Sequence, residues 1–225
     1  MTTIVVFDLD DTLYPERSFV WSGFRAVGSH VLKRWGIRDF DEACLSALEM
    51  GIKNSVFQWA YHAAVGTELT HEQAQELLQV YREHQPEALP WHADALETVQ
   101  SLHGRFPLTL LSDGYLPTQV NKARALGLAR WIDAPVFTES LGREHWKPSK
   151  KGFELIMSRH RQDSMFVYVG DNPAKDFIAP RALGWSTVQI TRPMGTYAHV
   201  EATQDRAADY RISSLVDLTA VLRDL

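Results

Sequence analysis

The chain has 225 residues, of which 45% are hydrophobic and 23% charged, and its formal net charge at pH 7 is -5. This length allows one domain with a sizeable insertion, and the composition is that of a globular protein rather than of a disordered or fibrous one. The acidic balance provides no overall attraction for nucleic acid or for an anionic membrane surface, so neither is expected as a partner.

The chain opens with a short apolar run, Ile4-Val5-Val6-Phe7, that passes directly into acidic residues. This start has neither the basic residues nor the long apolar stretch of a signal peptide, and the later apolar runs are too short to cross a bilayer. The single cysteine, Cys44, has no second cysteine with which to form an internal disulfide. Together these features predict a cytoplasmic protein.

Short apolar runs without polar alternation are typical of strands that are covered on both faces of a parallel sheet. They lie at 4–7, 108–111, 135–137, 165–169 and 187–190. Helical patterns occupy 92–104, 117–127, 149–161, 174–184 and 214–224. This alternation of strands and helices predicts an α/β fold with an open, Rossmann-like parallel sheet.

Several of the helical patterns carry signals for their ends. The expected left-handed C-terminal caps are Gly104, Gly127 and Gly184, and the expected N-caps are Ser149 and Ser213. Pro180 lies inside the pattern 174–184, where it removes a backbone donor and crowds the preceding turn. We therefore expect a kink or two short helices there.

The segment 16–89 interrupts the alternation, because it contains amphipathic helical patterns and no strand pattern. Thr70 and Gln73 fit a capping box at the start of one of its helices. One apolar helical face is formed by Val20, Phe24, Val27, Val31 and Trp35. We expect 16–89 to form a helical cap domain, inserted into a core domain made of 1–15 and 90–225.

Acidic residues follow two of the predicted strands. Asp8, Asp10 and Asp11 come directly after the first, and Asp171 and Asp176 come after the run 165–169. Ligands of open α/β sheets bind at the carboxyl ends of the strands, so we expect these acids to converge there. Two carboxylates roughly 4 Å apart repel by about 4 kcal/mol at an effective dielectric constant of about 20. Such a cluster therefore requires a cation.

The residue types in this pattern point to magnesium and a phosphate. Oxygen-only ligation favours Mg²⁺, which accepts carboxylates, water and phosphate oxygens. Zinc is disfavoured because no histidine or cysteine pairs with the acids at a useful spacing. Ser112, Asp113 and Gly114 follow another predicted strand and supply donors for phosphate oxygens, and Lys147 would add a positive charge.

The chain resembles the haloacid dehalogenase (HAD) superfamily of phosphohydrolases, because four motifs of that family occur in order. They are Asp8-Leu9-Asp10-Asp11-Thr12, then Ser112, then Lys147 before Pro148, and finally Asp171 with Asp176. The resemblance covers the chain outside the insert, and the insert resembles the family's helical cap. It implies a magnesium-dependent phosphatase that hydrolyses a small phosphomonoester, a sugar phosphate or a nucleoside monophosphate, through an aspartyl-phosphate.

The resemblance also implies roles for individual residues. Asp8 would be the nucleophile, and Asp10 would protonate the leaving oxygen and later deprotonate the attacking water. The implied metal ligands are Asp8, the backbone carbonyl of Asp10, Asp171 and Asp176. The residues assigned to the substrate phosphate are Ser112, Asp113 and Lys147. Asp11 is interpreted as a loop residue that makes local hydrogen bonds.

Other functions use parts of the same pattern. A phosphotransferase or phosphomutase would need the same residues, and a 2-haloacid dehalogenase would need no metal and would lack Asp10. A signalling receiver would place its acids in another order and would have no insert, and a non-catalytic binding protein would be expected to have lost Asp8, Asp10 or Lys147. The phosphatase hypothesis is favoured, and both a monomer and a homodimer remain open.

Overall fold

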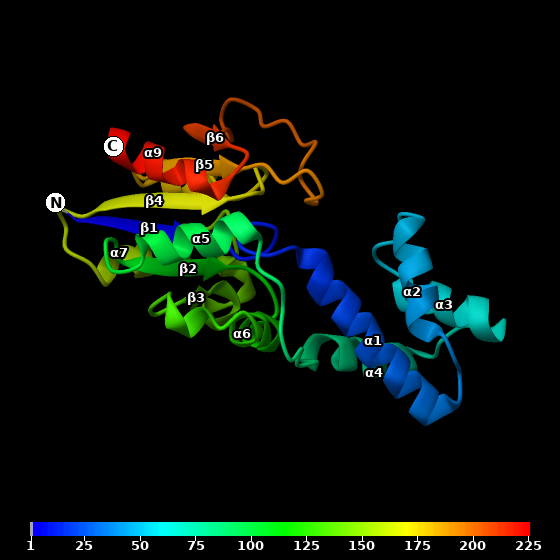
Figure 1. The fold of residues 1–225 in the computed structure, drawn as a ribbon. Coiled ribbons are helices and arrows are strands. Elements are labelled where there is room, and N and C mark those ends of the chain that lie inside the picture. The colour runs from blue at the N-terminus through cyan, green and yellow to red at the C-terminus, as the bar shows by residue number, and fades with distance from the viewer. Residues whose placement is uncertain (1) are drawn as a thin grey trace. The chain divides into compact units, whose positions relative to one another are not determined.

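The computed structural model describes residues 2–225, which divide into two compact units. We call Met1–Glu16 with Ala88–Leu225 the core unit, and Arg17–Glu87 the helical unit. Figure 1 shows the strands gathered in the core unit and helices alone in the other. Within residues 2–225 no helix is at once long enough and apolar enough to span a membrane.

The core unit is built on a parallel sheet with the strand order β3-β2-β1-β4-β5-β6. The strands are β1 (Thr3–Phe7), β2 (Leu108–Ser112), β3 (Val136–Phe137), β4 (Met165–Gly170), β5 (Ser186–Ile190) and β6 (Tyr210–Ile212). β1 lies between β2 and β4, and Phe7 is in register with Leu110 on one side and with Val169 on the other. The residue after Phe7 therefore emerges at the middle of the sheet edge.

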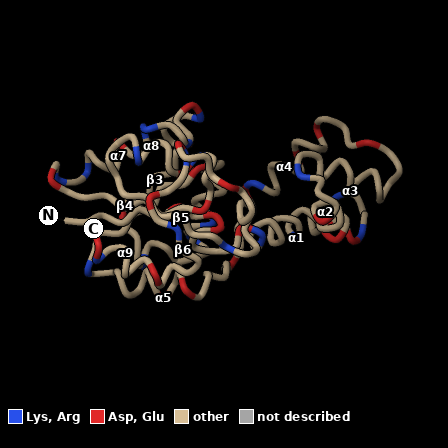
Figure 2. The backbone as a smooth tube through the Cα atoms, turned by 90° about the horizontal axis from the view of Figure 1, so that it is seen from above, with Lys and Arg blue, Asp and Glu red and all other residues tan. Residues whose placement is uncertain are grey.

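Helices cover both faces of this sheet. They are α5 (Ala93–Leu102), α6 (Leu116–Ala125), α7 (Lys151–Ser158), α8 (Ile178–Ala182) and α9 (Leu218–Asp224). Short 3₁₀ turns lie at Leu128–Arg130, Thr138–Leu141, Arg143–His145 and Leu215–Asp217. Figure 2 shows α7 and α8 on one side of the sheet and α5 and α9 on the other.

Burial of the sheet on both faces explains why its strands show no polar alternation. Ile4 and Val6 of β1 pack in a cluster that includes Phe153 of α7. The alternate residues of β1, Val5 and Phe7, are equally inaccessible. The predicted α/β fold with an open parallel sheet is therefore confirmed.

Some details of the prediction were wrong. β6 was not predicted, because its three residues are too few to show a pattern. Helix α8 begins only at Ile178, so Pro180 stands in its first turn, where its missing backbone donor breaks no helical hydrogen bond. The expected cap Ser213 is replaced by Ser214, whose side chain accepts from the Val216 amide.

The cap of α7 also differs, because the helix begins after Lys150 rather than Ser149. The hydroxyl of Ser149 still accepts a hydrogen bond from the Lys151 amide at 3.3 Å. The three predicted C-terminal glycines do adopt the left-handed conformation, and they are Gly104, Gly127 and Gly184. A side chain at these positions would be strained, which is why glycine ends the helices there.

The helices of the helical unit are α1 (Glu16–Trp35, whose first residue belongs to the core unit), α2 (Phe40–Glu49), α3 (Val56–Val65) and α4 (His71–Glu83). The apolar face predicted for α1 is confirmed, because Phe24, Val27 and Val31 are buried in a cluster with Leu77 of α4. The capping box is confirmed as well. Its side chains exchange hydrogen bonds with the backbone: the Gln73 amide donates to Thr70 Oγ1, and the Thr70 amide donates to Gln73 Oε1.

Candidate active site

The candidate site lies at the carboxyl ends of the three central strands. Asp8 follows β1, Ser112 is the last residue of β2, and Asp171 follows β4. The Asp8 amide donates to the Val169 carbonyl at 2.8 Å, which continues the pairing of β1 with β4 by one residue. The backbone ladder thus fixes where the Asp8 side chain leaves the sheet.

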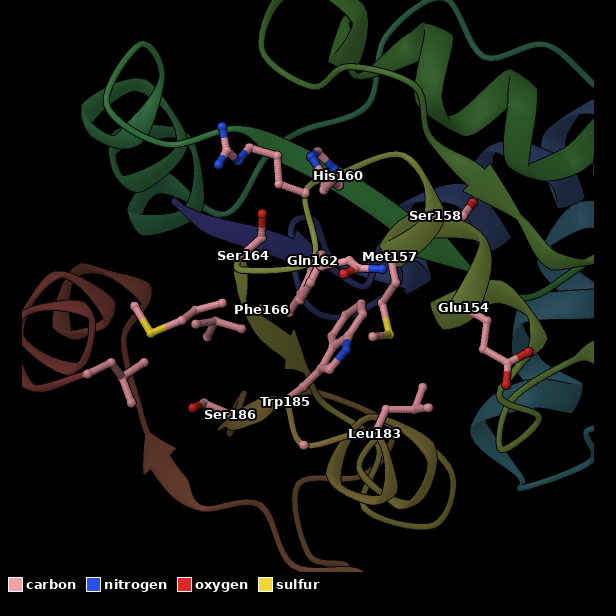
Figure 3. Close-up of a pocket in the computed structure, with 15 residues that line it drawn as sticks. Glu154, Met157, Ser158, His160, Gln162, Ser164, Phe166, Leu183, Trp185 and Ser186 are labelled. Atoms are coloured by element: carbon pink, nitrogen blue, oxygen red, sulfur yellow. The ribbon is translucent and has the colours of Figure 1, made fainter. Parts of the chain in front are cut away.

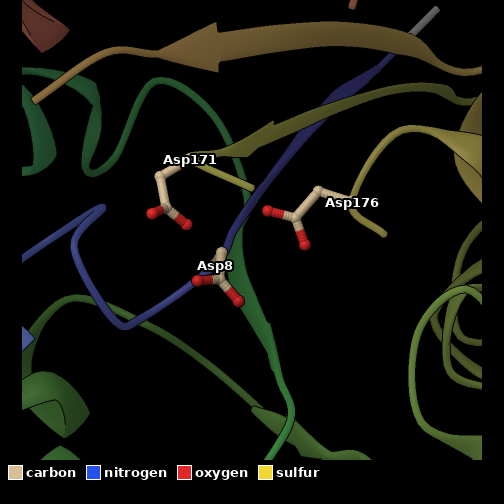
Figure 4. A group of neighbouring side chains, drawn as sticks. All are labelled: Asp8, Asp171 and Asp176. Atoms are coloured by element: carbon tan, nitrogen blue, oxygen red, sulfur yellow. The ribbon is translucent and has the colours of Figure 1, made fainter. Parts of the chain in front are cut away.

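Asp8, Asp171 and Asp176 form a buried carboxylate cluster (Figure 4). One oxygen from each lies within 4.8 Å of the others, and the side chains are turned toward one another. Asp176 belongs to the loop after β4 and is completely buried. Three oxygen ligands with excess negative charge are a donor set that fits a hard divalent cation such as Mg²⁺.

Lys147 lies against this cluster and is itself buried. Its Nζ is 2.5 Å from Asp8 Oδ1 and 2.8 Å from Asp176 Oδ1, and it also donates to the Tyr168 hydroxyl at 2.8 Å. Burial lowers the pKa of the Lys147 ammonium, but Asp176 and Asp8 outweigh that effect and hold it well above the usual value. The lysine therefore stays charged among the acids.

The single positive charge of Lys147 does not balance three carboxylates, and the pKa values of the carboxyl groups are raised as a result. Burial raises the pKa of Asp8 to about 7, Lys147 opposes the rise, and Asp176 adds to it. Burial also raises the pKa of Asp171 well above its usual range, with further increases from Asp176 and Asp8. Such groups favour a bound cation, because it removes the cost of ionising them together.

Asp10 has a separate set of partners. Its Oδ1 accepts from the Tyr14 hydroxyl at 2.5 Å and from Lys122 Nζ at 2.7 Å, and its Oδ2 accepts from Gln119 Nε2 at 3.0 Å. Burial raises the pKa of Asp10, but Lys122, Tyr14 and Gln119 together bring it below the usual value. The Asp10 carboxylate is not a member of the three-acid cluster found among residues 2–225.

The residues assigned to the phosphate have different surroundings. Ser112 is buried, and its hydroxyl accepts a hydrogen bond from Gln119 Nε2 at 2.7 Å. The Asp113 carboxylate accepts from Thr138 Oγ1 at 2.8 Å, from the Lys147 amide at 3.1 Å and from Lys175 Nζ at 2.9 Å.

The Asp113 side chain is therefore not available to a phosphate. Burial raises its pKa, but Lys147 and Lys175 more than reverse the rise, so the carboxylate stays ionised and would repel an anion. The assignment of Asp113 to phosphate binding stays a prediction, and only its backbone amide could serve it, because the carboxylate is already bound. Its side chain instead positions the Lys147 backbone and the Lys175 ammonium.

The loop after β1 is tied down by residues from distant parts of the chain. Asp11 has a left-handed backbone, with φ of 52°, and its carboxylate accepts from the amides of Glu16 and Thr196, each at 2.9 Å. Arg192 donates to the Thr12 carbonyl at 2.8 Å. The predicted local hydrogen bond of Asp11 is confirmed, but the contact with Thr196 was not foreseen.

Sequence reasoning also missed Tyr14, Gln119 and Lys122. Gln119 and Lys122 are three residues apart in α6, so they share a helix face, and they follow shortly after Ser112. The available signal was an amphipathic pattern in which polar residues fill positions expected to be apolar. A helix that covers a parallel sheet with a polar face must direct that face at other polar groups.

Asp8, Asp10 and Asp171 border a cavity of about 150 Å³ in the core unit. Its lining consists of Asp8, Asp10, Glu16, Asp113, Gly114, Trp146, Asp171, Asn172, Lys175 and Tyr197. A larger cavity, of about 880 Å³, lies at the amino-terminal ends of β4 and β5 around Trp185 (Figure 3). Of the described residues that line the larger cavity, only Glu154 has an acidic side chain, whereas Asp8, Asp10 and Asp171 line the smaller one.

Comparison with known proteins supplies independent information. A model of haloacid dehalogenase-like hydrolases matches residues 2–184. Glyceraldehyde 3-phosphate phosphatase of Methanocaldococcus jannaschii is 27% identical, over 98% of this chain and 97% of that protein. Ribulose-1,5-bisphosphate 5-phosphatase of Halopiger xanaduensis is 26% identical, over 97% of this chain and 98% of that protein.

Two solved structures have the same fold. A putative HAD-hydrolase from Bacillus subtilis bound to magnesium aligns with a TM-score of 0.66 at 20% identity, and the alignment covers 98% of each chain. A 2-haloacid dehalogenase from Pseudomonas syringae pv. Tomato aligns with a TM-score of 0.63 at 22% identity, covering 100% of this chain and 99% of that one. At these identities the likeness establishes the arrangement of helices and strands.

Proposed function

The chain belongs to the family of haloacid dehalogenase-like hydrolases, and on that premise we propose that it is a magnesium-dependent phosphatase of small phosphomonoesters. The observation that carries the proposal is the contact of Lys147 with Asp8 and Asp176 beside Asp171, because it surrounds one carboxylate with both a lysine and further acids. Phosphoryl transfer depends mainly on such positioning and electrostatic stabilisation.

Asp8 is the proposed nucleophile. Lys147 contacts Oδ1, so we assign the attack on phosphorus to Oδ2. This attack forms an aspartyl-phosphate while the bond from phosphorus to the leaving oxygen breaks and Asp10 protonates that oxygen. Asp10 then deprotonates the water that hydrolyses this intermediate. Ser112, the Asp113 amide and Lys147 would bind the transferring phosphoryl oxygens.

The proposed magnesium ligands are Asp8, Asp171 and Asp176, together with the backbone carbonyl of Asp10. Bound there, the ion would neutralise the acids and the charge that develops on the phosphoryl oxygens. The fit rests on the oxygen donors of the cluster and on the raised pKa values of Asp8 and Asp171.

A small sugar phosphate is the proposed substrate, since the two phosphatases named above act on phosphorylated three- and five-carbon compounds. We further propose that the helical unit, Arg17–Glu87, serves as a cap that selects this substrate. A cap that closes over a site restricts it to small molecules and excludes water. A nucleoside monophosphate is the second substrate class to test.

The test is release of phosphate from p-nitrophenyl phosphate and from a panel of sugar phosphates and nucleotides, with Mg²⁺ and with EDTA. We expect Mg²⁺-dependent turnover by the wild-type protein and a loss of at least about 10³-fold in Asp8→Asn, because the nucleophile is removed. A 2-haloacid should release no halide. Halide release without phosphate release, or equal turnover by Asp8→Asn, would refute the proposal.

A further inference from the structure

Helix α6 buries polar residues instead of apolar ones. Its buried side chains are Thr118, Gln119, Asn121 and Lys122, and Lys122 is only 4% exposed. Burial of a lysine is costly unless a carboxylate neutralises it and accepts its hydrogen bonds. The position of this charge therefore requires an acid nearby, and that acid is Asp10.

The contacts on Asp10 are distributed unequally between its two oxygens. Oδ1 accepts from both Tyr14 and Lys122, whereas Oδ2 accepts from Gln119. A carboxylate oxygen can accept about two hydrogen bonds, so Oδ1 is fully used and Oδ2 keeps one direction open. Asp10 and Asp8 both line the 150 Å³ cavity, so a water molecule bound there would lie next to both carboxylates.

We propose that Lys122, assisted by Tyr14, is a positioning residue that holds Oδ1 of Asp10 so that Oδ2 accepts the proton of the hydrolytic water. This inference rests on the proposed phosphatase function. In the step concerned, the water oxygen forms a bond to phosphorus while its O–H bond breaks and the proton moves to Asp10 Oδ2. The bond from phosphorus to the Asp8 oxygen breaks, and its electron pair returns to Asp8.

The position of Lys122 separates its task from that of Lys147. Lys122 contacts Asp10, whereas Lys147 contacts Asp8 and Asp176. Loss of Lys122 should therefore impair hydrolysis of the aspartyl-phosphate while leaving its formation nearly intact. Formation is unaffected only when the leaving group departs without a proton, as p-nitrophenolate does.

The experiment compares the wild-type protein with Lys122→Met, using p-nitrophenyl phosphate with Mg²⁺. We expect kcat to fall roughly 10- to 100-fold, since general acid–base catalysis is worth about 10²- to 10⁴-fold in all. The ratio kcat/KM, which reports formation of the intermediate, should change less than about threefold. Acid quenching should trap more phosphorylated protein in the variant than in the wild type.

Two further variants separate positioning from folding. Tyr14→Phe keeps the ring and removes one hydrogen bond to Asp10 Oδ1. As in Lys122→Met, kcat should fall while kcat/KM stays nearly constant, and the fall in kcat should be roughly three- to tenfold. Arg124→Met removes an exposed charge from the same helix and should leave kcat unchanged.

The outcomes distinguish this inference from the function on which it rests. If Lys122→Met fails to fold, the kinetics of Tyr14→Phe decide. Equal losses of kcat and kcat/KM, or unchanged kinetics in Tyr14→Phe, would overturn the positioning role while leaving the phosphatase intact. A wild-type protein that neither releases phosphate nor becomes phosphorylated would overturn both proposals.

Discussion

Asp8 and Asp10 lie two residues apart on one loop, but their surroundings act on them in opposite directions. Asp8, Asp171 and Asp176 face one ammonium group, that of Lys147, so three negative charges meet one positive charge when all are ionised. Asp10 faces Lys122, so one charge meets one. The pKa of Asp8 is raised to about 7, whereas that of Asp10 is lowered.

This difference shows that the two acids depend on different cations. The excess of two negative charges around Asp8 matches the charge of a divalent metal ion. The Asp10 carboxylate is paired without one, because its cation, Lys122, belongs to the chain. Glu16 nearby adds no second full charge at neutral pH, since Asp10 raises the pKa of Glu16 to about 7. Removal of metal should therefore disturb the Asp8 cluster and leave the Asp10 contacts in place, and the predictions below test that separation.

The largest effect is expected from Lys147→Met, which removes the only ammonium in contact with both Asp8 and Asp176 among the described residues. Phosphatase activity should fall at least about 10³-fold, because a positioned charge for the transferring group is lost. The free energy of unfolding should fall by about 3–5 kcal/mol at pH 8 without metal, since buried carboxylates lose their partner.

Activity assays and urea unfolding measure these two losses. Lys151→Met is the matched control, because Lys151 is exposed at the start of α7 and should tolerate the change. Activity of Lys147→Met within tenfold of wild type would break the assignment of this lysine to the Asp8 cluster.

An intermediate effect is expected from Asp171→Asn. The variant keeps the shape of the side chain but reduces the negative charge of the cluster, so the Mg²⁺ concentration for half-maximal activity should rise roughly 10- to 100-fold. A magnesium titration of activity measures it. Tyr14→Phe, which alters only the surroundings of Asp10, should leave the magnesium requirement unchanged, and a comparable shift in both variants would contradict the separation.

The smallest effect concerns the stability of the metal-free protein. The pKa of Asp8 is raised from 3.8 to about 7, so between these values the folded protein holds a proton that the unfolded chain has lost. Stability should therefore fall as pH rises from about 4 to about 7. Asp10, with a lowered pKa, contributes in the opposite sense and loses its contribution on acidification.

Urea unfolding in EDTA at pH 5 and pH 8 tests this sign. At pH 8 we expect Asp8→Asn to be more stable than wild type by roughly 1–2 kcal/mol. The pKa shift of Asp8 alone would imply a larger gain, at about 1.4 kcal/mol per pKa unit. The gain is smaller because Lys147 loses a charged partner in the variant. Added Mg²⁺ should stabilise the wild type more than the variant. A variant that is less stable than wild type in EDTA at pH 8 would contradict the excess of negative charge.

The principal strands and the type of fold were predictable because they depend on local pattern. Buried parallel strands are short apolar runs, and the glycines that end helices stand where a left-handed residue is needed. β6 was not predicted, because it is defined by its pairing with β5 and its three residues show no strand pattern of their own. The late start of α8 depends on the loop of Asp176, whose amide bonds to the Asn172 carbonyl.

The acids and Lys147 were named from their positions after strands and from the order of four motifs, and their catalytic roles stay predictions. Asp113 shows the limit of that reasoning, because position alone does not say how its side chain is used. Its position after β2 places its backbone at the site, but Thr138, Lys147 and Lys175 determine which way its carboxylate is used.

The sequence by itself determined where the acids emerge, because each follows an apolar run that can only be a buried strand, and parallel strands end at one edge. Only the tertiary structure decided which cation each acid receives. Gln119 and Lys122 lie 109 and 112 residues from Asp10 along the chain. They meet it because packing turns one face of α6 toward the loop after β1, and no local pattern specifies that rotation.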